Sequence, residues 1–319
     1  MQFPPRGNIL FSSMTTEQTS PGSTRARALA ALTACALLWS TGGLLIKLVD
    51  WSPFAIAGVR SLIGGLLILA FVRRPRFTWS LAQIAGGVCY AGCMVLFVAA
   101  NKLTTAANAI VLQYTAPLYA TVLGWIYLRE RTSALDWAAI IVVMGGMVLF
   151  FLDRLGPGGM AGNLLAIVSG MFFAGTMVSL RGQKEGSPLE SILLSHGITF
   201  LVSIPFLWQG LPRAGASLPG LSRLGAPPLV LGIAGVLCLG IFQIGIPSFL
   251  LTYGVRRVSA LQTLLTAVLE PIFNPVWVFL AIGEVPGPRA LAGAAIIIVA
   301  VTLRSVLTLR RAVPQAAAG

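Results

Sequence analysis

Apolar stretches of about twenty residues, separated by short polar connections, repeat along most of this chain of 319 residues. A helix needs about 20 apolar residues to cross the hydrocarbon core of a bilayer. β-barrel strands would be shorter and would alternate in polarity, so the pattern predicts membrane helices. The ten expected spans are residues 28–47, 54–72, 79–100, 106–128, 134–152, 160–180, 189–208, 227–251, 258–281 and 288–308. The predicted fold class is therefore an all-α integral membrane protein with ten transmembrane helices.

Composition excludes an ordinary soluble globule. The chain is 56% hydrophobic and only 10% charged, with a mean hydropathy of +0.87. Soluble proteins devote about a quarter of their residues to Asp, Glu, Lys and Arg. The formal net charge of +13 comes from basic residues placed singly or in pairs between apolar runs. That placement is typical of loops beside membrane helices, so we expect the lipid bilayer, and no nucleic acid, as a partner.

The positions of Lys and Arg predict the orientation in the membrane. With both termini in the cytoplasm, 15 of the 22 basic residues fall on the inner side and 6 on the outer side. The remaining one is Arg60, which lies within the second span. Because inner loops of membrane proteins carry the excess of Lys and Arg, an even number of spans in the cytoplasmic (inner) membrane is expected.

An internal repeat divides the chain into two halves. The interval from Pro117 to Glu130 equals the interval from Pro271 to Glu284, and both runs are apolar. Five expected spans precede the 153–159 loop and five follow it, so the halves would insert in opposite directions as inverted repeats. We expect a disordered cytoplasmic tail over residues 1–27, a first repeat over 28–152, a second over 160–309 and a short tail over 310–319.

An ordered set of short motifs marks the two halves: Leu38-Trp39-Ser40, Ser52-Pro53 before Arg60, Ala116-Pro117 before Glu130, and Glu270-Pro271 before Glu284. Together they resemble the two EamA domains of the drug/metabolite transporter superfamily, over about residues 29–309. The resemblance implies a secondary transporter of small metabolites. Phe173 stands where the first repeat has Trp39, and Ser195 or His196 falls near the position equivalent to Arg60. The two repeats are therefore expected to contribute different groups to a site.

Glu270 is the main candidate for chemistry, because it lies about halfway along an expected span. An ionised carboxylate at that depth costs about 2.5–3.5 kcal/mol or more. We expect it to bind a proton or a substrate amine; the alternative is a neutral carboxyl group hydrogen-bonded between helices. Pro271 has no backbone N–H, which exposes the carbonyl about four residues earlier and interrupts the helix. Pro117 marks the matching helix break, or hinge, of the first half.

Several other polar side chains fall inside expected spans. Arg60 could bind a substrate carboxylate, pair with Glu270, or extend toward the membrane surface. His196 could carry protons or simply bond between helices. The remaining cavity candidates are Trp39, Asn101, Gln113, Tyr114, Gln243 and Asn274. Aromatic rings mixed with amides suit a small amphipathic metabolite, although each group could equally make a helix–helix contact.

The sequence offers no catalytic set. It has one histidine, its four cysteines lie in apolar runs, and it lacks a Walker loop, so we expect no metal, cofactor or direct use of ATP. The favoured function is a secondary transporter that exports a small metabolite or amino acid by alternating access, coupled to protons through Glu270. Alternatives are an uncoupled facilitator, a metabolite antiporter, or, from another class, a membrane enzyme or a scaffold subunit. The sequence predicts no particular oligomeric state.

Overall fold

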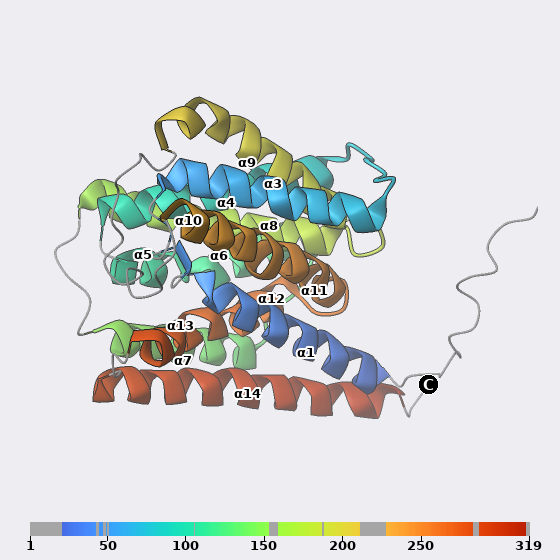
Figure 1. The fold of residues 1–319 in the computed structure, drawn as a ribbon. Helices are drawn as coiled ribbons and strands as arrows, with labels where there is room; N and C mark the ends of the chain where they lie inside the picture. Colours follow the sequence, from blue (N-terminus) through green and yellow to red (C-terminus); the bar gives the residue numbers. More distant parts are fainter. Residues whose placement is uncertain are drawn as a thin grey trace, which may run out of the picture.

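The protein is described by a computed structural model, which covers residues 21–42, 45–46, 49, 51–104, 106–152, 159–186, 188–210, 228–282 and 287–316. Within these ranges the secondary structure is helical, with no strand, and the helices lie side by side in one bundle (Figure 1). In chain order they are α1 (Pro21–Ser40), α3 (Pro53–Val72), α4 (Leu81–Leu103), α5 (Ala106–Gln113), α6 (Ala116–Leu123), η1 (Gly124–Leu128), α7 (Ala134–Phe151), α8 (Met160–Gly182), α9 (Pro188–Gly210), α10 (Pro228–Cys238), η3 (Leu239–Gly245), α11 (Ile246–Val255), α12 (Ala260–Ala267), α13 (Leu269–Ile282) and α14 (Pro288–Ala316).

The described residues contain eight helical segments long and apolar enough to cross a membrane, plus a shorter apolar segment, Ala260–Phe273. The expectation of membrane helices is confirmed at this level. Two helix ends differ from the sequence prediction. Helix α1 already begins at Pro21, inside the expected N-terminal tail, and α14 continues to Ala316, inside the expected C-terminal tail. Helix propensity does not stop where hydrophobicity stops, so a helix can extend beyond its apolar part.

Serine residues fix the starts of several helices. The side chains of Ser52, Ser80 and Ser259 each accept a hydrogen bond from a backbone N–H in the first turn of α3, α4 and α12. The Ser133 side chain does the same for α7. The carboxylate of Asp136 in turn accepts a hydrogen bond from the Ser133 backbone N–H, which completes a capping box. These bonds satisfy N–H groups that the helices themselves leave without partners.

Packing joins helices that are far apart in the sequence. The most extensive contacts join α4 to α8, α3 to α9 and α7 to α14. Small residues allow close approach between α7 and α14, because a Cβ added at Gly146 would lie 2.7 Å from the Ile297 side chain. A Cβ added at Gly293 would lie 2.6 Å from the backbone nitrogen of Phe150. Close backbone contact of this kind stabilises helix pairs in a membrane.

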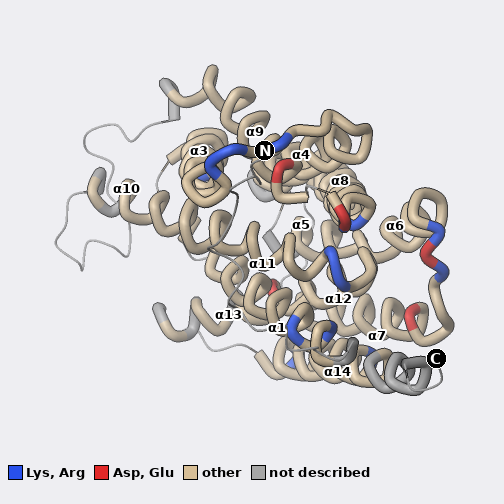
Figure 2. Tube along the Cα trace, turned by 90° about the vertical axis from the view of Figure 1, so that its right-hand side faces the viewer, with Lys and Arg blue, Asp and Glu red and all other residues tan. Residues whose placement is uncertain are grey.

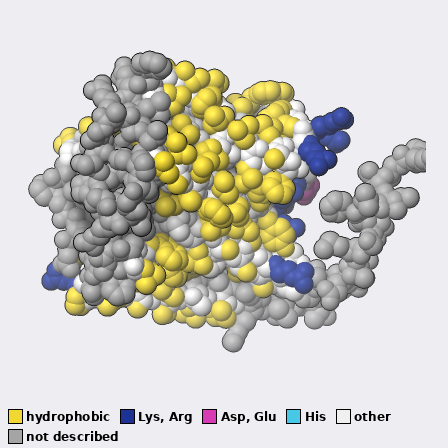
Figure 3. Space-filling model, in the orientation of Figure 1, with side chains coloured by type: hydrophobic (Ala, Val, Ile, Leu, Met, Phe, Trp, Pro, Cys, Tyr) yellow, Lys and Arg dark blue, Asp and Glu magenta, His cyan; other side chains and the backbone are white. Residues whose placement is uncertain are grey.

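The surface is divided into an apolar part and a charged end. Hydrophobic side chains cover much of the visible face in Figure 3, whereas Lys and Arg gather toward its right-hand end. Figure 2 looks at that end directly and shows basic and acidic residues at the ends of several helices. This distribution is what a bilayer-spanning bundle requires, because charges are costly at hydrocarbon depth. Of the expected site residues, Trp39, Arg60, Gln113, Tyr114 and His196 have side chains buried between the helices.

Candidate functional site: two broken helices and a buried polar cluster

Two interrupted helices meet in the middle of the bundle. Helices α5 and α6 are separated at Tyr114 and Thr115, just before Pro117, and α12 and α13 are separated at Val268, just before Pro271. Each break therefore precedes one of the two prolines that the sequence singles out. A proline cannot donate to the carbonyl four residues earlier, so each break leaves a carbonyl oxygen without its usual helical partner.

Tyr114 connects the two breaks. Its side chain is 3% exposed, and its hydroxyl donates to the Ala267 carbonyl oxygen at 3.0 Å. Ala267 is the residue four positions before Pro271, so the tyrosine satisfies the carbonyl that the proline leaves free. The same hydroxyl lies 2.7 Å from Oε2 of Glu270, which is partly buried at the start of α13. The contact joins residues 156 positions apart, one from each half of the chain.

Aromatic rings line one side of this junction. The Phe173 ring on α8 lies 6.2 Å from the Tyr114 ring in an edge-on arrangement, and 6.2 Å from the Trp39 ring on α1. Beside them, Trp277 of α13 donates its indole N–H to the Ser40 hydroxyl at 2.7 Å. Sequence reasoning did not single out Trp277; a tryptophan with a polar N–H inside an apolar span was the available signal.

Arg60 is buried on α3 and is only 6% exposed. Its Nη1 donates to Oε1 of Gln243 at 3.2 Å, while its Nε has no hydrogen-bond partner among the described residues. Gln243 lies on η3, a π-helical segment, and π-helical turns are frequent at functional sites. Among the described residues, no direct ion pair joins Arg60 to Glu270.

His196 lies next to this arginine, on α9. It is 1% exposed, and neither ring nitrogen has a hydrogen-bond partner within the described part of the chain. Its ring centroid is 6.2 Å from that of Tyr90, and a Cβ at Gly64 would lie 3.5 Å from its Nε2. We use the name central cluster for two neighbouring groups of buried and partly buried residues: Trp39, Tyr114 and Glu270 at the helix breaks, and Arg60, His196 and Gln243 beside α3.

Other predicted site residues are placed differently. Gln113 donates through Nε2 to the Ser169 hydroxyl on α8 at 2.8 Å, in a buried contact between two helices. That geometry fits the structural interpretation of this residue. A Cβ at Gly170 would lie only 2.6 Å from the Gln113 carbonyl oxygen, so glycine is required where α8 passes the first helix break. The side chains of Asn101 and Asn274 lie outside the described part of the structure.

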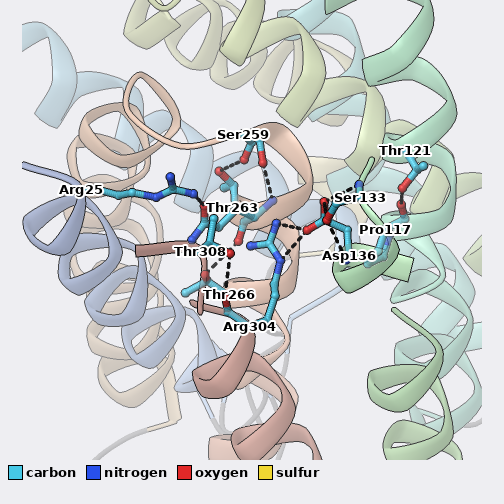
Figure 4. A network of polar contacts seen from close by, with 11 residues as sticks. Arg25, Pro117, Thr121, Ser133, Asp136, Ser259, Thr263, Thr266, Arg304 and Thr308 are labelled. Atoms are coloured by element: carbon cyan, nitrogen blue, oxygen red, sulfur yellow. Dashed lines mark hydrogen bonds and ion pairs between the residues drawn. The ribbon is translucent and has the colours of Figure 1, made fainter. Parts of the chain in front are cut away.

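A second group of polar contacts lies at the charged end (Figure 4). Arg304 of α14 donates to Oδ1 of Asp136 on α7 at 2.6 and 2.9 Å, and Arg25 of α1 donates to Oε1 of Gln262 on α12 at 2.6 Å. Elsewhere at this end, Arg181 of α8 forms an ion pair of 3.0 Å with Glu130. Each of the three contacts links the first half of the chain to the second.

These features define a polytopic membrane protein of the transporter class. Apolar helices, two of them interrupted near their middle, surround the central cluster. The sequence profile of the EamA-like transporter family matches residues 26–152 and 160–306. The chain belongs to this family, and it is a transporter rather than an enzyme.

Comparisons with individual proteins agree with this assignment. The chain is 27% identical over 293 residues to the uncharacterized transporter YwfM of Bacillus subtilis, covering 88% of this chain and 95% of that protein. It is 25% identical over 253 residues to the pseudopaline exporter CntI of Pseudomonas aeruginosa, covering 76% and 82% of the two chains. A solved crystal structure superposes with a TM-score of 0.72 at 21% identity, covering 90% of this chain and 99% of that one, which shows the shared fold.

Proposed function

We propose that this protein is a secondary exporter of a small metabolite or amino acid, driven by protons through Glu270. Ten spans in two inverted five-span repeats would rock around the central cluster, with both termini in the cytoplasm and the bundle in the cytoplasmic membrane. The central cluster would hold the substrate between the halves. A relative named as an exporter supports the export direction.

The proton hypothesis rests on the contacts of the Tyr114 hydroxyl, which has fewer hydrogens than acceptors around it. A tyrosine hydroxyl has one hydrogen, yet it faces two acceptors, the Ala267 carbonyl at 3.0 Å and Glu270 at 2.7 Å. The carbonyl can only accept. Both contacts are fully satisfied when Glu270 carries a proton and donates it to the tyrosine oxygen. With Glu270 ionised, the single tyrosine hydrogen must be shared, so losing the proton changes the bonding between the two halves.

The packing of the bundle supports inverted repeats. Each helix of one half has an equivalent in the other half: α4 corresponds to α11, and α1 corresponds to α8. The contact between α4 and α8 therefore has the contact between α11 and α1 as its equivalent. The contact between α6 and α8 becomes that between α13 and α1, while the pairs α3–α9 and α7–α14 map onto themselves. A bundle related by a two-fold axis in the membrane plane has this exchange pattern.

The three contacts at the charged end support alternating access. The pairs Arg181–Glu130, Arg304–Asp136 and Arg25–Gln262 all hold the two halves together at the end rich in Lys and Arg. By the positive-inside rule this end faces the cytoplasm. The described conformation would then be closed toward the cytoplasm, and these contacts would have to separate when the substrate enters from that side.

Transport in proteoliposomes provides the test. We would measure counterflow with a panel of amino acids and small metabolites, with and without an imposed pH gradient. Wild-type protein is expected to show exchange that responds to the gradient. Glu270→Gln resembles the protonated acid and can still donate to Tyr114, so it should fold and exchange substrate without responding to the gradient. Glu185→Gln removes an exposed carboxylate outside both the central cluster and the three closing contacts, and serves as the matched control.

Two outcomes would contradict parts of this proposal. A Glu270→Gln variant with the wild-type response to pH would refute coupling through this residue. Exchange that ignores the gradient even in the wild type would favour the uncoupled facilitator or antiporter, for which the satisfied hydrogen bond between Glu270 and Tyr114 provides a purely structural role.

A further inference from the structure

The charged end contains buried donors that no described residue satisfies. Nη1 of Arg304, Nε of Arg25 and Nε2 of Gln262 are buried, and none has a hydrogen-bond partner among the described residues. Arg304 is 4% exposed and Gln262 is 0% exposed. In Figure 4, Arg25 of α1 points toward α12, and Arg304 of α14 lies near α12 with its guanidinium bonded to Asp136. A buried donor without an acceptor is costly, so this arrangement favours binding an additional acceptor.

Asp136, the acidic partner of Arg304, has no capacity left to accept further hydrogen bonds. Oδ1 of Asp136 accepts both bonds from Arg304, at 2.6 and 2.9 Å. Oδ2 accepts from the backbone nitrogen and the hydroxyl of Ser133, at 2.9 and 2.8 Å. A carboxylate offers about four lone-pair sites, and all four are used. The group of Arg25, Arg304 and Asp136 keeps a net positive charge, and Arg181 adds to the positive field at Arg25.

An apolar groove leads directly to Arg304. It lies on the outer side of the α7–α14 pair and has a volume of about 440 Å³. Its lining includes Leu135 and Val142 of α7 together with Ile296, Val299 and Arg304 of α14. Val299 is 61% exposed, so the groove opens to the surroundings of the bundle. From Leu135 to Val142 the groove runs roughly 10 Å along the helix axis, most of the depth of one bilayer leaflet.

We propose that this end of the protein binds an anionic phospholipid of the inner leaflet. The acyl chain would lie in the groove between α7 and α14, and the phosphate would accept from Arg304, Arg25 and Gln262. Charge complementarity selects the lipid: the donors are cationic, the adjoining surface is apolar, and basic pockets between helices on the cytoplasmic side suit anionic headgroups. The proposal concerns a site away from the central cluster and does not depend on which solute is transported.

Native mass spectrometry tests this site on the purified full-length protein. The protein would be taken from nanodiscs of equal parts phosphatidylglycerol and phosphatidylcholine, and the lipid that remains bound would be identified. We expect about a tenfold preference for phosphatidylglycerol, the size of a charge-assisted phosphate contact. Arg304→Gln and Arg25→Gln should each reduce that preference severalfold. Arg257→Gln removes an exposed arginine of the same end, which stacks on Tyr253, and should leave it unchanged.

A groove-filling variant separates the acyl site from the phosphate site. Ala300→Phe leaves every arginine in place, so it covers the case in which Arg304→Gln fails to fold, and it should lower retention of both lipids. Stabilisation by inorganic phosphate equal to that by phosphatidylglycerol would overturn the lipid assignment in favour of a free anion. Equal retention of phosphatidylcholine would also overturn it, as would dimers that form through this groove and exclude lipid.

Discussion

Removing one oxygen atom from Tyr114 tests the contact between the two broken helices. Tyr114→Phe deletes a hydroxyl that serves the Ala267 carbonyl at 3.0 Å and Glu270 at 2.7 Å, and it leaves the ring against Phe173 in place. Because Tyr114 is 3% exposed, water is not expected to replace the hydroxyl. Two buried groups would then lose their partner, including the carbonyl that Pro271 leaves free.

The magnitude follows from the two contacts. A neutral hydrogen bond contributes about 0.5–1.5 kcal/mol, and one to a charged group about 1.5–3 kcal/mol. Tyr114→Phe should therefore lower the free energy of unfolding by about 2 kcal/mol when Glu270 is protonated and both bonds are made, and by about 1.5–3 kcal/mol when it is ionised and the one tyrosine hydrogen goes mainly to the carboxylate. The coupling between Tyr114 and Glu270 is accordingly expected to be larger at pH 8 than at pH 5, since protonation removes the charge.

The assay is unfolding of the purified protein in mixed micelles titrated with SDS, at both pH values. A double-mutant cycle with Tyr114→Phe and Glu270→Ala, neither of which can keep the hydrogen bond, isolates the interaction between the two side chains. Tyr127→Phe, at a tyrosine that is 71% exposed, provides the matched control and should change stability by less than about 0.5 kcal/mol. If Tyr114→Phe behaves like this control, the two helix breaks are not held together by the tyrosine.

Three further predictions concern the framework around the site. Gly170→Ala should lower the midpoint of thermal unfolding, because its Cβ would lie 2.6 Å from the Gln113 carbonyl oxygen. Gly145→Ala is the control and should leave the midpoint unchanged, because the space around Gly145 is open. Equal midpoints for the two variants would contradict the close approach of α8 to the first helix break. Ser133→Ala removes the cap of α7 and should cost about 1 kcal/mol of unfolding free energy, with Ser133→Asp restoring most of it. Glu130→Gln should cost about 1 kcal/mol or less, since both partners of the pair with Arg181 keep some exposure; a loss above about 3 kcal/mol would indicate a fully buried pair.

Some features of the central cluster could be predicted from local sequence and others could not. Pro271 predicts a free carbonyl about four residues earlier, and the structure places the Tyr114 hydroxyl on Ala267. The identity of that donor was not predictable, because it comes from 153 positions away. Likewise, the sequence left three roles open for Arg60: binding a substrate carboxylate, pairing with Glu270, or extending toward the membrane surface. The structure gives it Gln243 as a partner and no direct ion pair with Glu270.

The sequence by itself determined that this protein is a bundle of membrane helices, because runs of apolar residues and sparse charges can be satisfied only in lipid. It also offered Pro117 and Pro271 as places where a helix loses a backbone hydrogen bond, although proline alone does not decide a break, since α9 continues through Pro205. Only the tertiary structure decided which polar groups meet. Tyr114 and Glu270, or Asp136 and Arg304, come together because of how each helix is rotated and packed, and small residues such as Gly170 set that packing. Lipid tails are as apolar as the side chains that face them, so the hydrophobic effect does not favour one rotation of a membrane helix over another. No pattern of apolar residues could therefore have predicted these rotations.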